Sequence, residues 1–439
     1  MTRKLLSAAA LMVAVFFTGS LVAQAAEVTF GGQLRPRLEL WDESAAGVHT
    51  SFIDMRVRLN TKVKIDEKTS AFIQFQANQR FGSKSKDCTA FPCVTTLPGS
   101  RGSNVDNGND TTADVGLHQA YFTIKKLFDQ PVDLKLGRQE VVLDGHRLFG
   151  HTGWTMGAQS HDALRVTHSH DNMTISFIYS KVVENANKKI AGENFGGTDG
   201  DENSDQDFYI LWANMKGLVG GNSSTSGILV FVDDDTLAAN EDFYTIGVRH
   251  AGGAGNIDYR GEFYYQNGDS ATGTSGDKSA FMVGLRAGLK MPAVNMKPKI
   301  TLWFDYLSGN EATVVDDEQF DTLFDTGHKF YGFMDKFAGG QGNPKEGLMD
   351  LAVKAALKPT AKTVLKADLH FFIFAEDRGV GVGPGTGGGD GVGQELDVTW
   401  KYKYSPSTTF SVGASYFFAD ANFEPDDSNW VYTMIDLKF

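Results

Sequence analysis

The stretch DMRVRLNTKVKID, residues 54–66, alternates between apolar and charged or polar side chains. Its apolar parity holds Met55, Val57, Leu59, Val63 and Ile65, and its other parity holds Asp54, Arg56, Arg58, Asn60, Lys62 and Lys64. Successive side chains of a strand point to opposite faces, so this segment has one aliphatic and one cationic face. Two structures offer those environments: a soluble sheet with one wet face, or a barrel wall between lipid and a water-filled lumen.

The start of the chain has the pattern of an exported protein. A basic beginning is followed by an apolar run over residues 5–17 and by a small-residue cleavage pattern at 23–25. These features predict a signal peptide over 1–25 and a mature protein over 26–439. The chain has 54 acidic and 41 basic residues, a net charge of -13, which disfavours a nucleic-acid partner.

The remainder of the chain continues the alternation of the opening stretch. Beyond the signal, no window long enough for a spanning helix stays apolar, so entry into a membrane would be by strands. Period-two segments predict about eighteen strands, an even number, as bacterial barrels have. Their expected ranges are 28–41, 52–65, 71–81, 115–125, 132–141, 161–167, 173–183, 208–216, 227–233, 243–250, 257–266, 280–290, 299–307, 348–357, 363–374, 395–404, 408–418 and 430–439.

The connections between these segments are alternately short and long. Short periplasmic turns and long extracellular loops are typical of outer-membrane barrels, whereas a soluble sandwich has no reason to keep that alternation. We therefore expect an all-β fold, a transmembrane antiparallel β-barrel of about eighteen strands in the outer membrane of a Gram-negative bacterium. The long segments 142–160 and 308–347 are expected to fold inward and narrow the lumen.

Strand parity assigns many bases to the lumen. Acids such as Glu39, Asp54 and Asp258 share that face, but the bases outnumber them roughly two to one. A cationic lumen favours anionic solutes, although mixed charges could also simply pair across the wall. The pore-lining bases expected by parity are Arg35, Arg37, Arg56, Arg58, Lys62, Lys64, Arg165, Arg249, Arg260, Arg286, Lys366 and Lys401.

Little in the sequence indicates catalysis, a metal or a cofactor. Five of the ten histidines lie between residues 146 and 170, but strand placement separates them between the two ends of a barrel. No Ser, His and acid set stands out, so we expect a protein that is not an enzyme. Cys88 and Cys93 lie in a long connection and are expected to form a loop disulfide in an oxidising compartment.

The segment LKLGRQEVVLDGHRLFGHTGWTMGAQSHDALRV, residues 134–166, resembles the signature of the alginate export porins. Segments 320–337 and 394–418 are also similar to parts of that family. The resemblance implies an eighteen-stranded outer-membrane barrel whose basic constriction passes an acidic polysaccharide. It adds Arg138 and Arg147 to Arg165 as pore-lining candidates, although such arginines would equally suit the pinning of a loop. The matching positions are Gly137, Arg138, Gln139, Gly145, Arg147, Leu148, Gly150, Trp154, Asp162 and Arg165.

One departure from the family concerns gating. The alginate exporter has a long periplasmic plug loop, whereas the last expected periplasmic turn here is only residues 405–406. The sequence thus predicts a channel for anionic solutes, from uronate polymers and oligomers to smaller acids, with outer-membrane lipid around it. The alternatives are a general diffusion porin and a barrel that sheathes a partner protein at the periplasm or surface, such as an electron carrier.

Overall fold

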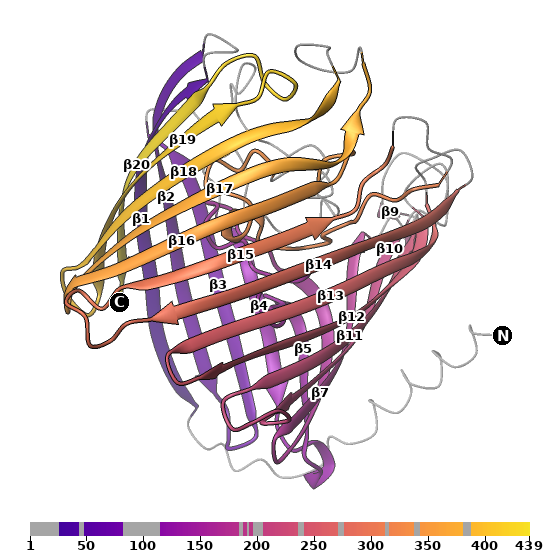
Figure 1. The fold of residues 1–439 in the computed structure, drawn as a ribbon. Helices are drawn as coiled ribbons and strands as arrows, with labels where there is room; N and C mark the ends of the chain where they lie inside the picture. The colour runs from indigo at the N-terminus through magenta and orange to yellow at the C-terminus, as the bar shows by residue number, and fades with distance from the viewer. Residues whose placement is uncertain are drawn as a thin grey trace.

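The computed structural model describes residues 26–43, 48–81, 115–183, 188–190, 193–195, 205–235, 241–270, 276–311, 316–337, 343–380 and 388–439. These residues form an 18-stranded antiparallel sheet that the pairing of the first and last strands closes into a barrel (Figure 1). The expected fold class and strand number are therefore confirmed. The expected signal peptide (1–25) and the expected disulfide between Cys88 and Cys93 lie outside the described residues.

The barrel strands follow one another around the wall in chain order, and β8 (Lys188–Ile190) and β9 (Glu193–Phe195) make a separate hairpin. The barrel is built from β1 (Glu27–Glu43), β2 (Val48–Lys64), β3 (Thr69–Arg80), β4 (Gly116–Ile124), β5 (Val132–Gln139), β6 (His161–His170), β7 (Met173–Val183), β10 (Gln206–Lys216), β11 (Ser224–Asp234), β12 (Glu241–Ala254), β13 (Ile257–Asp269), β14 (Asp277–Lys290), β15 (Lys299–Leu307), β16 (Leu348–Thr360), β17 (Thr363–Arg378), β18 (Gly389–Lys403), β19 (Thr408–Ala419) and β20 (Ser428–Lys438).

The opening stretch lies in β2 and separates its faces as the sequence predicts. Leu59 is 54% exposed on the outside of the barrel, whereas Arg56 is 3% exposed on the inside. Only a barrel in lipid puts the aliphatic face outward in this way, because a soluble sheet would bury it. The wall closes where Gly32 and Phe439 exchange backbone hydrogen bonds of 2.8 and 3.2 Å, so the strands nearest the termini are paired as well.

The two ends of the barrel differ in the length of their connections. At one end the strands are joined by tight turns, including residues 171–172 and 361–362, and bacterial barrels place such turns at the periplasm. The turn after β18 spans residues 404–407, and Ser405 donates to the carbonyl of Thr408 at 3.2 Å, so this turn is too short for a plug. In the described part of the chain, no helix combines the length and apolarity that a membrane crossing requires.

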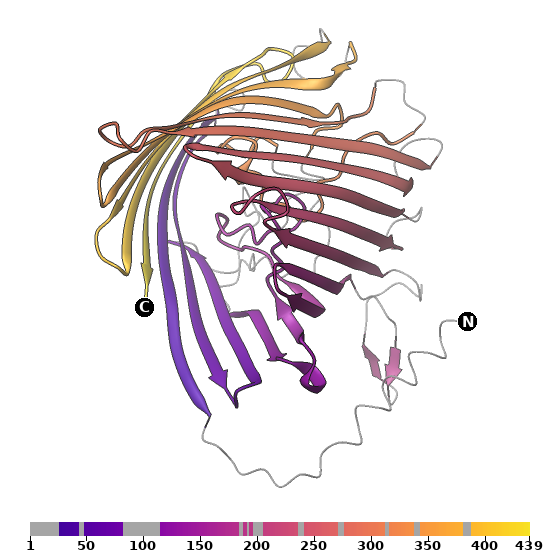
Figure 2. The same cartoon turned by 60° about the horizontal axis from the view of Figure 1, so that its bottom comes forward.

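Two connections from the long-loop end lie inside the barrel, as Figure 2 shows for the segment that follows β5. We name residues 140–160 the first lumen segment and residues 316–337 the second lumen segment. Phe149 and Phe324 form a parallel bridge between them, and both rings pack on Phe208 of the inner wall. The apolar core of the molecule is therefore partly inside the barrel, between these segments and one side of the wall.

Arg147 fastens the first lumen segment to the opposite wall. Its guanidinium donates to Glu262 at 2.8 Å and to both carboxylate oxygens of Asp305 at 2.8 and 2.9 Å. It also donates to the hydroxyl of Tyr331 at 2.9 Å and lies 3.8 Å above the ring of Phe330, so it joins both lumen segments. The arginine is 1% exposed, and the buried charges compensate one another.

Replacing Arg147 tests this anchor. Arg147→Met leaves Glu262 and Asp305 buried without their strongest partner, so we expect the free energy of unfolding to fall by about 3–5 kcal/mol. Urea unfolding in detergent micelles measures it. Lys68→Met, which removes an exposed pair with Asp129, is the matched control and should lose far less stability, because solvent screens that pair. Equal losses in the two variants would contradict the anchoring role.

Candidate functional site

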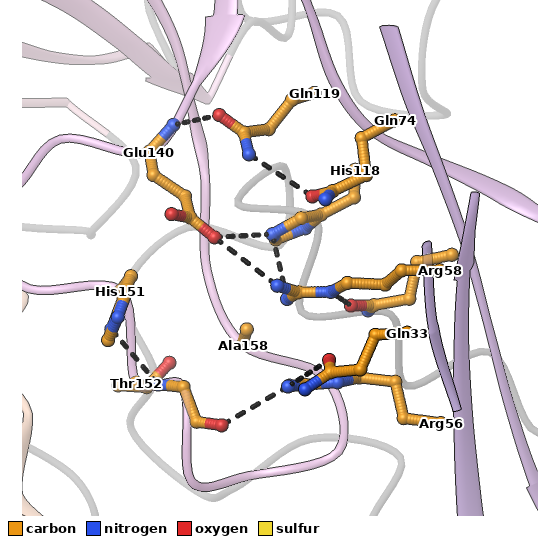
Figure 3. A network of polar contacts seen from close by, with 12 residues as sticks. Gln33, Arg56, Arg58, Gln74, His118, Gln119, Glu140, His151, Thr152 and Ala158 are labelled. Carbon is orange, nitrogen blue, oxygen red and sulfur yellow. Dashed lines mark hydrogen bonds and ion pairs between the residues drawn. The ribbon is translucent and has the colours of Figure 1, made fainter. Parts of the chain in front are cut away.

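The polar side of the first lumen segment faces the wall made by β1 to β4, and Figure 3 shows the contacts at its two ends. At the start of the segment, Glu140 accepts from His118 at 3.0 Å and forms an ion pair with Arg58 at 3.6 Å. Arg58 also donates to Gln76 at 2.6 Å. Burial alone would raise the pKa of Glu140, but the hydrogen bond from His118 and the charge of Arg58 together lower it. Glu140 is therefore ionised at neutral pH.

The far end of the segment contacts the same wall through its backbone. Arg35 donates to the carbonyls of Gly153, Trp154 and Thr155 at 2.6, 2.9 and 2.8 Å. Arg56 donates to the carbonyls of Gly153 and Thr155 at 3.3 and 3.0 Å. These arginines are register partners on β1 and β2, so both guanidinium groups serve one short stretch of loop. They narrow the lumen by holding that stretch in place.

Arg37 belongs to the same group, but its charge is compensated. It donates to Glu39 at 2.6 Å and to the carbonyl of Trp154 at 2.9 Å. The Trp154 ring lies between the guanidinium of Arg37, at 4.3 Å, and the ring of His328, which stacks on it at 4.3 Å. The two faces of this tryptophan are occupied by the protein itself.

A second group of expected bases lies near the periplasmic turns, except for Arg165, which lies at the middle of β6. Its members are on the inner parity of their strands and are half-buried or exposed toward the lumen. In the part of the chain that the structure describes, none of them makes an ion pair with a carboxylate. This turn-proximal group consists of Lys62, Lys64, Arg165, Lys366 and Lys401.

A third group of expected bases is paired with acids. Arg249 and Arg260 lie 3.7 and 3.3 Å from Glu262, and Arg260 also stacks over Trp303 at 4.3 Å. Arg286 pairs with Asp258 at 2.8 Å. Arg147 is buried in its ion pairs and does not face open water, which corrects the expectation that it lines the pore. These bases pair with acids of the wall, the alternative that the sequence left open to a role in attracting anions.

Arg138 also departs from the expectation. It shares the outward parity of Leu134 and Leu136 on β5 and bonds in a bidentate manner to Asp162 of β6, at 2.9 and 2.8 Å. It therefore lies on the outer side of the wall instead of in the pore. The outward parity of Arg138 on β5 corrects the expectation, taken from the family resemblance, that it lines the pore.

The signature residues mostly build the first lumen segment. Gly150 passes so close to the second segment that a Cβ would lie 2.1 Å from Thr326 Oγ1. Gly137 has a φ of 120° beside the carbonyl of Ala120, a conformation that favours glycine. Leu148 is buried in the core, and Arg147 is the anchor. The residues that carry the resemblance thus mainly fix the loop inside the barrel, and they do not identify the side chains that would contact a solute.

Two ionisable groups of the second lumen segment, Asp325 and Lys329, have pKa values close to neutral pH. Burial raises the pKa of Asp325 to about 8. Desolvation inside the barrel and the nearby arginines, Arg260 and Arg147 foremost, lower the pKa of Lys329 to about 8. His146 behaves differently, since burial and Lys329 lower its pKa to about 4. At pH 7 the histidine and Asp325 are mainly neutral and Lys329 is mainly charged.

Some polar lumen residues had not been singled out from the sequence. Lys135 lies on the inner face of β5, 3.8 Å above the ring of Tyr121, and parity over 132–139 would have found it. His118 sits where the pairing of β3 and β4 shifts register, and no period-two pattern signals such a bulge. His146 and His151 touch at 4.9 Å between ring centres. Among the described residues, no three His, Cys, Asp or Glu side chains are grouped to hold a metal.

Comparison with known structures gives the same architecture. OccAB1 of Acinetobacter baumannii matches with a TM-score of 0.60 at 11% identity, over 94% of this chain and 96% of that one. OprD of Pseudomonas aeruginosa matches with 0.57 at 13% identity, over 94% of each chain. OpdO of the same species matches with 0.60 at 10% identity, over 94% and 97%. At such identities the likeness concerns the fold.

Comparison with families is more specific. No curated protein matches the chain. A family model described as alginate export matches residues 26–429, nearly the whole barrel. The chain therefore belongs to the alginate export family, and it is an outer-membrane β-barrel with the fold of porin channels.

Proposed function

We propose that this channel passes anionic solutes, with uronate-type polysaccharides or oligosaccharides as the favoured class. The observation that carries the proposal is the turn-proximal group, five bases that face the lumen with no carboxylate partner among the described residues. Unpaired cations along a pore lower the electrostatic barrier for anions and raise it for cations. Family membership supports acidic polysaccharide as the solute.

The two alternatives make different demands on the lumen. A sheath for a partner protein needs a wide interior, but the two lumen segments span from the Phe208 side of the wall to the Arg35 side. That arrangement favours a channel for solutes over a sheath. A general diffusion porin would carry the same segments but show little preference for charge. The proposal includes export by a signal peptide at 1–25 and transport without catalysis.

Removing the turn-proximal charge tests the proposal directly. Lys62→Gln, Lys366→Gln and Lys401→Gln together should lower the anion-to-cation permeability ratio about two- to fivefold, because three uncompensated cations leave the pore. The measurement is the reversal potential of the purified protein in a planar bilayer under a salt gradient. Lys216→Gln, Lys297→Gln and Lys362→Gln, exposed positions at periplasmic turns, remove equal charge outside the lumen. Cation selectivity in the unmodified protein would sink the proposal.

The pH dependence of selectivity offers an independent check. As the pH rises from about 6.5 to about 9.5, Lys329 loses its positive charge and Asp325 gains a negative one. Both changes make the lumen more negative, so anion preference should decrease with rising pH. The double variant Asp325→Asn and Lys329→Met should show a smaller pH response in the same reversal-potential measurement. A preference that rises with pH would contradict the assignment.

A further inference from the structure

The tip of the first lumen segment, residues 152–158, is held to the wall mainly through its own carbonyl groups. Those of residues 153, 154 and 155 accept from Arg35, Arg37 and Arg56, and the carbonyl of Gly157 accepts from Gln76 at 2.6 Å. Consecutive carbonyls thus present a row of partial negative charge to a row of guanidinium groups. The tip occupies the arginines as an anionic ligand would.

The charge balance at this contact is incomplete. Arg35 is 5% exposed and Arg56 is 3% exposed, and in the described residues neither forms an ion pair with a carboxylate. Asp436 and Glu140 act on them only from a distance, and Arg58 adds further positive charge. The Nε atoms of Arg35 and Arg56 have no hydrogen-bond partner. Arg56 also donates to the amide oxygen of Gln33 at 2.9 Å, so among the described residues the hydrogen-bond acceptors of these two adjacent buried cations are all neutral. Such an arrangement is costly, and a carboxylate would compensate the charges better.

The tip has a strained residue at each end, and the chain on both sides of it is held in place. Thr152 and Ala158 have φ of 42° and 60°, a left-handed conformation that is strained for a residue other than glycine. Before the tip, Arg147 anchors the chain; after it, Gln159 donates to the carbonyls of Gly150 and Phe324 at 2.6 and 2.7 Å. Movement of the tip would therefore relieve local strain without disturbing the anchors.

We propose that the tip is a tethered competitor for the arginines, and that a solute with two or more neighbouring carboxylates displaces it and widens the channel. A carboxylate can make two parallel bonds to one guanidinium and brings a full compensating charge, whereas each loop carbonyl brings only a dipole. Both Arg35 and Arg56 must be re-paired, and the Trp154 stack on His328 resists displacement. One carboxylate is insufficient, so the gate selects acidic oligosaccharides over single sugar acids. This inference rests on the proposed function and adds its regulation.

Distance measurement between two spin labels tests the displacement. In a Cys88→Ser, Cys93→Ser background, one label is placed at Met156→Cys, beside Arg35, and the other at Lys362→Cys, on an exposed periplasmic turn. At saturation, trigalacturonate should shift about half or more of the molecules to a second distance between the two labels. Galacturonate and neutral maltotriose should leave the distance between the labels unchanged. A pair of labels at Lys216→Cys, the last residue of β10, and at Lys362→Cys, on a turn, should keep one distance throughout and so report an intact barrel.

The arginine variants provide the second arm. Arg35→Gln with Arg56→Gln should populate the second distance without any ligand, because the tip has lost its strongest donors. The heat-modifiable electrophoretic mobility of the variant shows whether it folds. If it does not fold, the addition of trigalacturonate to the labelled protein with its native Arg35 and Arg56 decides alone. An unchanged distance with trigalacturonate overturns the gate. If the bilayer still shows anion preference in that case, the proposed function stands; if preference is absent as well, both fail.

Discussion

The structure depends on one constraint, the contact of each strand with two different environments. One face of a strand must be apolar toward lipid, and the other must suit water or the packed loops. All backbone groups must also be hydrogen-bonded around a closed wall. Lipid supplies no hydrogen bonds, so the wall has no freedom to leave an edge open. Closure by β1 and β20 and the alternation in β2 are consequences of that requirement. Most charged side chains of the wall then face the lumen, with exceptions such as the Arg138–Asp162 pair on the outside.

The wall charges are used in three ways. Near the periplasmic turns, lysines such as Lys366 and Lys401 face the lumen without a carboxylate partner among the described residues. On β13 and β15, Glu262 and Asp305 pair with Arg147 of the first lumen segment and with Arg260 of the wall, which fixes the lumen segments. On β1 and β2, Arg35 and Arg56 bind loop carbonyls. The inward face of the wall therefore holds bases without a carboxylate partner among the described residues, an anchor for the loops and a contact between arginines and backbone.

The family signature illustrates why sequence likeness and solute contact are different matters. Gly137, Leu148 and Gly150 are required where backbones approach closely or where the segment enters the core. Arg138 serves the outside of the wall through Asp162. A motif can therefore be specific for the family because it builds the loop that crosses the lumen, whether or not its residues contact a solute.

The sequence by itself determined the barrel, its approximate number of strands and the direction of most side chains in the wall, because period two is a local property of the backbone. It missed strand ends such as the start of β18 at Gly389, since glycine-rich residues look like a turn until a neighbouring strand pairs with them. It identified the inward bases, but it could not say which have partners. Glu262 and Asp305 meet Arg147 across more than a hundred residues of chain, and the carbonyls that bind Arg35 carry no side-chain signal. Only the folding of the two lumen segments into the barrel decided which cations are compensated, because that depends on contacts far apart in sequence.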